Sequence, residues 1–167
     1  MQKVFGMISL GCDKNRVDGE RLLGEVRRRG CPITDDPLEA QVLIVNTCAF
    51  LNAARKEAID TIIEGNSLRS GKLEKIVVAG CLPEKYIAEL YPALTEGDVF
   101  LGVSDCSQLF PALERAYAGE RVNAVGTGCE GAERVITTPP HLKYLKIADG
   151  CFNHCTYCLI PSIRGKY

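Results

Sequence analysis

The sequence contains no apolar run close to the ~20 residues that a helix needs to span a bilayer, which excludes an ordinary membrane-spanning helix. It has no excess of charge of either sign. The net charge is −1 over 167 residues, so no global field attracts the chain to nucleic acid or to an anionic membrane. The first residues lack a secretory cleavage pattern. With 46% hydrophobic and 25% charged residues, the composition is that of a soluble globular protein, which we expect in the cytoplasm.

Cysteine, in contrast, is abundant. Nine cysteines in a chain without an export signal indicate a reducing compartment, where thiols serve metal or redox chemistry rather than disulfides. The odd number also excludes a complete set of disulfides within one chain. The arrangement of these cysteines is therefore the main guide to function.

Short apolar segments alternate with helical patterns over residues 1–120. The expected strands are residues 4–10, 42–45, 75–79 and 99–101. This alternation predicts an α/β fold, a parallel sheet with helices on both faces. Residues 121–141 hold several glycines and prolines without periodicity and are predicted to be a linker. Residues 142–167 then begin a second, truncated domain, in which Tyr144–Ala148 form a strand that leads into a cysteine-rich loop.

Three helix boundaries can also be predicted. A helix follows Asp18 and ends near Gly30, where glycine commonly terminates helices. Pro83 suits the first turn of another helix, and Pro92 lies just beyond its end. Asp105 is expected to cap a third helix.

Three of the cysteines, Cys12, Cys48 and Cys81, each follow the end of a predicted strand and precede a predicted helix. In an open parallel sheet these strand ends share one edge, where ligands bind, so the three thiols are expected to meet. Three thiolates suit a four-iron cluster with one iron left open. The adjacent helix starts are expected to favour thiolate over thiol. The alternative is that each cysteine is a small buried apolar residue.

Another three, Cys151, Cys155 and Cys158, form a Cys-x3-Cys-x2-Cys motif in one short loop. Three thiolates at this spacing can each bind one iron of a four-iron, four-sulfur cluster and leave the fourth iron without a protein ligand. A structural zinc site needs four ligands, and no fourth cysteine follows. The alternatives are a zinc knuckle completed by His154, or three unrelated cysteines.

Together these motifs resemble the radical S-adenosylmethionine methylthiotransferases. The resemblance rests on Ser9–Asp18, Val45–Phe50 and Ala79–Cys81, which look like the N-terminal domain of that family. Tyr144–Gly165 looks like the start of its catalytic (β/α) barrel, here only the first strand and the cluster loop. A whole barrel needs roughly 200 residues or more, so we expect an N-terminal fragment that does not turn over alone.

The family has several branches, and one is most similar. The motifs that carry this similarity are Leu10–Cys12, Lys14–Asn15, Cys48–Phe50 and Ile160–Ser162. They resemble the branch that modifies an aspartate of ribosomal protein twelve of the small subunit at its β-carbon. Asp13 departs from the proline that is frequent there, and Gly19 from a serine. Two alternatives remain: methylthiolation of a tRNA adenosine, and a non-catalytic iron–sulfur or zinc-binding module.

The resemblance also implies roles for individual residues. Cys151, Cys155 and Cys158 would hold a 4Fe-4S cluster that binds and cleaves S-adenosylmethionine, with Tyr157 against its adenine. Cys12, Cys48 and Cys81 would hold a second, auxiliary 4Fe-4S cluster that presents the sulfur to be transferred. The implied partners are the small-subunit ribosomal protein or the ribosome, and a flavodoxin-type electron donor.

Overall fold

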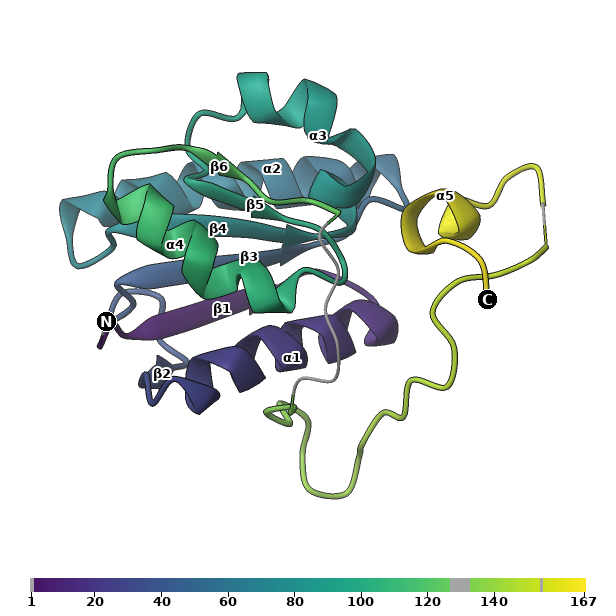
Figure 1. Cartoon of the computed structure of the whole chain (residues 1–167), viewed down its shortest axis with the longest axis horizontal. Helices are drawn as coiled ribbons and strands as arrows, with labels where there is room; N and C mark the ends of the chain where they lie inside the picture. The colour runs from purple at the N-terminus through teal and green to yellow at the C-terminus, as the bar shows by residue number, and fades with distance from the viewer. Residues whose placement is uncertain (1, 127–132, 154) are drawn as a thin grey trace.

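A computed structural model describes residues 2–126, 133–153 and 155–167. The strands are β1 (Phe5–Ser9), β2 (Ile33–Thr34), β3 (Val42–Thr47), β4 (Lys75–Gly80), β5 (Val99–Leu101) and β6 (Val122–Asn123). They form one parallel sheet in the order β2-β1-β3-β4-β5-β6 (Figure 1). The α-helices are α1 (Asp13–Arg28), α2 (Asn52–Asn66), α3 (Cys81–Ala93), α4 (Leu109–Tyr117) and α5 (Ile160–Arg164). Two 3-10 turns, η1 (Ser67–Ser70) and η2 (Cys106–Gln108), complete the set of described helices.

Helices cover both faces of the sheet, as the sequence predicts. On one face, α1 and α4 pack against alternate strand residues such as Ile44 and Val77. On the other face, α2 and α3 pack against the neighbouring residues, Val45 and Val78. Because both faces are covered, all six residues of β3 are buried, which explains its nearly continuous apolar run.

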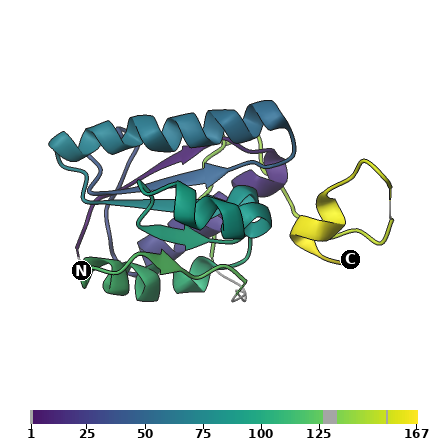
Figure 2. The ribbon, with the colours of Figure 1, turned by 90° about the horizontal axis from the view of Figure 1, so that it is seen from above.

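The helix α5 and the loop before it lie beyond one end of the sheet, outside the two helical layers (Figure 2). Among the described residues, no helix is long and apolar enough to cross a membrane.

The sheet continues past residue 120, where the predicted linker begins, and residues 127–132 of that linker lie outside the described residues. Strand β6 lies within the predicted linker, and its Val122 pairs with Val99 of β5. The predicted strand at Tyr144–Ala148 is wrong, because residues 142–148 have no regular secondary structure. Leu145 and Ile147 are both 83% exposed. A strand needs a neighbour to accept its hydrogen bonds, and none of the described strands runs beside this segment.

The helix boundaries also differ from the predictions. Helix α1 begins at Asp13 rather than after Asp18, and α3 includes Pro92. Asp105 is the N-cap residue of the short helix η2, but its side chain makes no capping hydrogen bond. Its carboxylate accepts hydrogen bonds from the backbone N–H groups of Gly102 (2.6 Å) and Gly126 (2.9 Å) instead. This carboxylate therefore ties the loop after β5 to the segment after β6.

Residues 133–149, which we call the strap, run beside α1 on its outer side and lead to the loop that precedes α5 (Figure 1). The buried carboxylate of Glu20 anchors the strap. It accepts hydrogen bonds from Arg134 (2.5 Å) and from the backbone N–H of Thr137 (2.8 Å). The strap passes so close to α1 at Gly24 that a Cβ atom there would lie 1.7 Å from the carbonyl oxygen of Glu133.

Replacing Gly24 with alanine is therefore expected to displace the strap. The new methyl group meets backbone, which cannot rotate away, and overpacking of this kind costs about 1–3 kcal/mol. The displacement is measured as faster hydrogen–deuterium exchange over residues 133–137, together with a lower thermal midpoint of unfolding. The matched control is Gly65→Ala in α2, where the nearest atom lies 3.4 Å from the new Cβ. That variant gains about 1 kcal/mol of helix propensity and keeps normal exchange in the strap. Equal exchange in both variants would contradict the prediction.

The same anchor makes docking of the strap sensitive to acid. Burial alone would raise the pKa of the Glu20 carboxyl, but the hydrogen bonds from Thr137 and Arg134 hold that pKa below its ordinary value of 4.5. A carboxyl whose pKa is lowered by folding contributes stability above its unfolded pKa and loses it as the pH falls through the folded one. We therefore expect proteolytic nicking of the strap to increase below about pH 4. Glu20→Gln should weaken the docking at neutral pH and flatten this pH dependence.

Candidate functional site

The three cysteines predicted to converge, Cys12, Cys48 and Cys81 (the first cysteine set), line one cavity of about 310 Å³. They follow β1, β3 and β4, which are adjacent strands of the sheet. Adjacent strands lie ~4.8 Å apart, so side chains that follow their ends are brought within reach of one shared ligand. The structure thus confirms the predicted meeting of the three loops.

Each thiol occupies a different local position. Cys12 is the N-cap residue of α1, and Cys81 is the first residue of α3. Gly80, just before Cys81, has a φ of +100°, a backbone conformation that favours glycine and that turns the chain from β4 into the helix. Cys12 is exposed, Cys48 is half-buried and Cys81 is buried, and all three are free thiols.

Two cations lie on the wall of the same cavity, Lys14 from α1 and Arg164 from α5. The guanidinium Nη2 of Arg164 is 3.5 Å from the sulfur of Cys81. Burial nevertheless raises the pKa of the Cys81 thiol, and only part of this effect is offset by Arg164. At Cys81, desolvation therefore outweighs the nearby positive charge, and the pKa of the thiol lies above its ordinary value rather than below it as the helix start predicts.

A buried ion network connects this cavity with the C-terminal residues. Arg164 contacts the carboxylates of Asp18 (2.8 Å) and Asp149 (2.6 Å). Lys146 contacts the same two carboxylates, at 2.6 and 3.0 Å. The backbone oxygen of Asp149 also accepts a hydrogen bond from Lys14 (2.9 Å). No pattern in the sequence predicts this network, although its members all lie in the motifs that resemble the family.

The second cysteine set, Cys151, Cys155 and Cys158, lies in the loop between the strap and α5. Cys155 is exposed and the other two are half-buried; all three are free thiols. The loop is closed by hydrogen bonds from Cys151 N to Gly165 O (3.2 Å) and from Cys158 N to Cys155 O (3.0 Å). Tyr157 is 82% exposed, so it does not pack into a core. His154, the alternative zinc ligand, lies outside the described residues.

Within the described ranges, no group of three His, Cys, Asp or Glu side chains is arranged to hold a single metal ion. Thiolates around one tetrahedral zinc lie about 3.8 Å apart, as Zn–S bonds of about 2.3 Å require. Thiolates around a four-iron cluster are farther apart, because each binds a different iron. A cavity of about 310 Å³ that is lined by three cysteines and two cations fits a four-iron cluster better than a single zinc ion.

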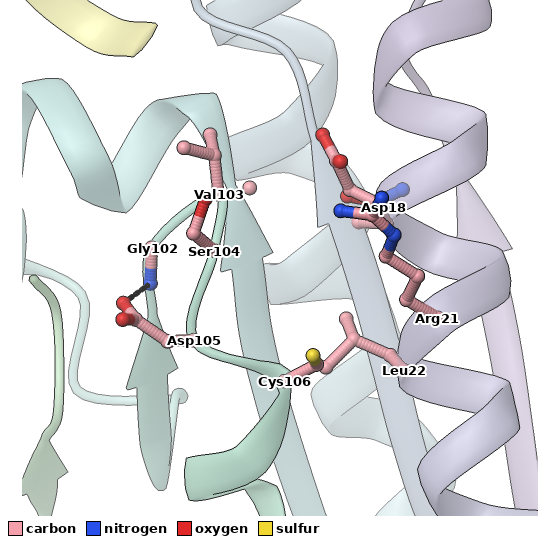
Figure 3. Close-up of a pocket in the computed structure, with 10 residues that line it drawn as sticks. Asp18, Arg21, Leu22, Gly102, Val103, Ser104, Asp105 and Cys106 are labelled. Atoms are coloured by element: carbon pink, nitrogen blue, oxygen red, sulfur yellow. Dashed lines mark hydrogen bonds between the residues drawn. The ribbon is translucent and has the colours of Figure 1, made fainter. Parts of the chain in front are cut away.

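A smaller cavity of about 10 Å³ lies beside the first, between α1 and the loop after β5 (Figure 3). Asp18 and Arg21 line it from α1, and Gly102 and Asp105 line it from the loop. Its volume is enough for about one water molecule. Of these two cavities, the one lined by the first cysteine set is therefore the candidate site.

The fold and the site define an α/β domain whose three thiols meet at the carboxyl edge of a parallel sheet. The chain belongs to the uncharacterized protein family UPF0004, whose sequence model matches residues 4–102. It is 47% identical to the ribosomal protein uS12 methylthiotransferase RimO of Clostridium tetani (strain Massachusetts / E88), over 98% of this chain and 37% of that protein. Identity to the protein of the same name from Thermoanaerobacter sp. (strain X514) is 40%, over 99% of this chain and 39% of that protein.

The protein of this name from Pelotomaculum thermopropionicum is 43% identical, over 98% of this chain and 38% of its own length. The chain thus spans less than two fifths of these curated relatives. The relatives confirm the resemblance to the methylthiotransferases, and to the ribosomal-protein branch, that the cysteine motifs predict.

Proposed function

We propose that this chain is part of an enzyme that adds a methylthio group to the β-carbon of an aspartate in ribosomal protein uS12. One observation carries the proposal: the first cysteine set lines a single cavity, and Arg164, six residues after Cys158, forms part of its wall. Two sets of three cysteines, rather than one, are what a reaction with separate radical and sulfur-donating centres requires. The names of the relatives support the ribosomal substrate.

Each cysteine set would hold one 4Fe-4S cluster with one iron lacking a protein ligand. When bound, these clusters and S-adenosylmethionine supply the radical and the methylthio sulfur. The chain itself would position and shield them. Lys14 and Arg164 bring positive charge to a site that gathers thiolates. The cavity of the first cysteine set also has apolar walls that exclude water, formed by Leu51, Ile160 and Ile163. Tyr157, which is free of core contacts, would stack on the adenine.

The proposal also includes a domain division. Residues 1–120 would form the domain of the first cysteine set, residues 121–141 the connection, and residues 142–167 the beginning of a radical S-adenosylmethionine barrel. Strand β6 lies in the connection and continues the sheet.

The proposed partners are uS12, alone or in the ribosome, and a flavodoxin-type electron donor, all in the cytoplasm. The test uses cells that lack their own uS12-modifying enzyme and express the whole protein. Mass spectrometry of uS12 is expected to show an aspartate in which one hydrogen is replaced by a methylthio group. The Cys48→Ala variant is expected to leave uS12 unmodified.

Methylthio-adenosine in tRNA digests, with unmodified uS12, would replace the proposal with the tRNA reaction. Stoichiometric zinc without iron in protein purified and reconstituted without oxygen would remove the enzymatic function altogether.

A further inference from the structure

Two asparagine side chains lie between the loops that carry the first cysteine set. Asn15 is in the first turn of α1, three residues after Cys12, and Asn46 is near the end of β3, two residues before Cys48. Both asparagines are fully buried, with 0% exposure. Burying a carboxamide costs free energy unless its hydrogen bonds are made, so the partners of these side chains indicate what they do.

The two asparagines join the first loop to the second. The Nδ2 group of Asn15 donates a hydrogen bond to the carbonyl oxygen of Thr47 (3.1 Å), next to Cys48. In return, Nδ2 of Asn46 donates to the backbone carbonyl of Asn15 (2.8 Å) and to Oγ of Ser9 (3.3 Å). Each loop therefore holds the other through a side chain that reaches across the gap between β1 and β3.

The third loop packs directly on the same pair. A Cβ atom at Gly80, the residue before Cys81, would lie 2.8 Å from Nδ2 of Asn15 and 2.8 Å from Oδ1 of Asn46. Thr47 adds a hydrogen bond from its hydroxyl to the carbonyl oxygen of Ala79 (2.7 Å). The backbone beside Cys81 is thus fixed against both asparagines.

The carbonyl oxygens of both side chains, Oδ1 of Asn15 and Oδ1 of Asn46, are buried without a hydrogen-bond partner. Oδ1 of Asn15 instead lies against Gly11, where a Cβ would be only 2.1 Å away. Unpaired buried oxygens reduce stability, so stability alone does not explain the pair. What the pair does provide is a fixed spacing between three loops.

We infer that Asn15 and Asn46 are positioning residues that hold the first cysteine set at the spacing an iron–sulfur cluster needs. Neither asparagine lines the 310 Å³ cavity, and both contact the backbone of the loops that carry the cysteines. The inference rests on the proposed function, because that function gives the first cysteine set its cluster. Outer residues that orient ligands in this way typically change metal affinity by about 10–100-fold when replaced.

The test begins with the full chain carrying Cys151→Ala, Cys155→Ala and Cys158→Ala, so that all cluster iron belongs to the first set. Asn46→Asp keeps the shape of the side chain but removes the Nδ2 donor. Asn15→Ala removes the hydrogen bond to the carbonyl oxygen of Thr47 and introduces no charge. Each protein is reconstituted without oxygen with ferrous iron and sulfide, and its iron, sulfide and visible absorption are measured. The background chain is expected to bind about four irons, and each asparagine variant is expected to need about tenfold more free iron to reach the same content.

A second readout needs no iron. Hydrogen–deuterium exchange of the metal-free chain is expected to be faster in all three loops (residues 9–16, 45–49 and 79–82) in both variants. The matched control is Leu113→Ala, which opens a cavity under α4. It lowers the thermal midpoint but leaves both iron content and loop exchange at the background level.

Unchanged loop exchange in both asparagine variants would overturn the inference, as would full iron content with an unchanged spectrum. A background chain that binds no iron at all would contradict the proposed function instead. In that case loop exchange alone decides whether the two asparagines position the cysteines.

Discussion

Replacing Cys48 with alanine is expected to lower the iron content of the reconstituted chain from about eight to about four atoms. The proposed four-iron cluster of the first cysteine set would then lose one of its three protein ligands. Cys48 is half-buried and lines that cavity, so its loss affects the site more than the core. Iron and sulfide analysis after anaerobic reconstitution measures the effect.

The loss should be specific to the two cysteine sets. Cys155→Ala is likewise expected to leave about four irons, and the double variant none. Cys31 is the matched control, because it is a buried cysteine at the opposite end of α1 and lines no part of the cavity. Cys31→Ala keeps about eight irons. Eight irons in the Cys48 variant, or a loss in the Cys31 variant, would contradict the assignment.

Replacing Arg164 with methionine is expected to detach α5 and the second-set loop from the sheet. The Arg164 side chain is 4% exposed and pairs with Asp18, which is 6% exposed, so neither charge is well solvated. Removing one partner of a buried ion pair costs about 3–5 kcal/mol, because the other charge stays buried without full compensation. Lys146 alone would then face two carboxylates.

Hydrogen–deuterium exchange over residues 150–165 is the direct measurement, and urea unfolding gives the free energy. Arg115→Met is the control, since Arg115 and Glu120 form an ion pair on the surface, with both side chains more than half exposed. Exposed pairs contribute about 0–1 kcal/mol, so this variant should remain close to wild type. Similar losses in both variants would show that burial of the Arg164 network is unimportant.

The sequence was sufficient to predict the meeting of the first cysteine set. The prediction needed only that strands before Cys12, Cys48 and Cys81 are parallel, since their ends then share an edge. It did not require side-chain detail. The order of the strands, which places β1, β3 and β4 side by side, agrees with that reasoning.

The strap and its ion network could not be predicted in this way. Lys146 and Asp18 are 128 residues apart in the sequence, and no periodic pattern encodes a contact between them. The strand expected at Tyr144–Ala148 failed for a related reason. Alternating apolar residues indicate an extended segment, but whether it becomes a strand depends on a neighbour that local sequence does not reveal.

Asp105 shows a third limit. An aspartate before a helical pattern predicts a cap, yet here two loop N–H groups, of Gly102 and Gly126, compete successfully for the carboxylate. One of these donors is 21 residues away. Local propensity was outweighed by contacts that form only in the folded chain.

In the described chain, the sheet is finished by Asn123, while the strap and the second cysteine set follow it. Domains generally fold from the N-terminus during synthesis. The sheet edge that carries the first cysteine set can thus fold before the second set emerges from the ribosome. Under the proposed function, the first cysteine set would be open to iron and sulfide until Arg164 completes the wall of its cavity.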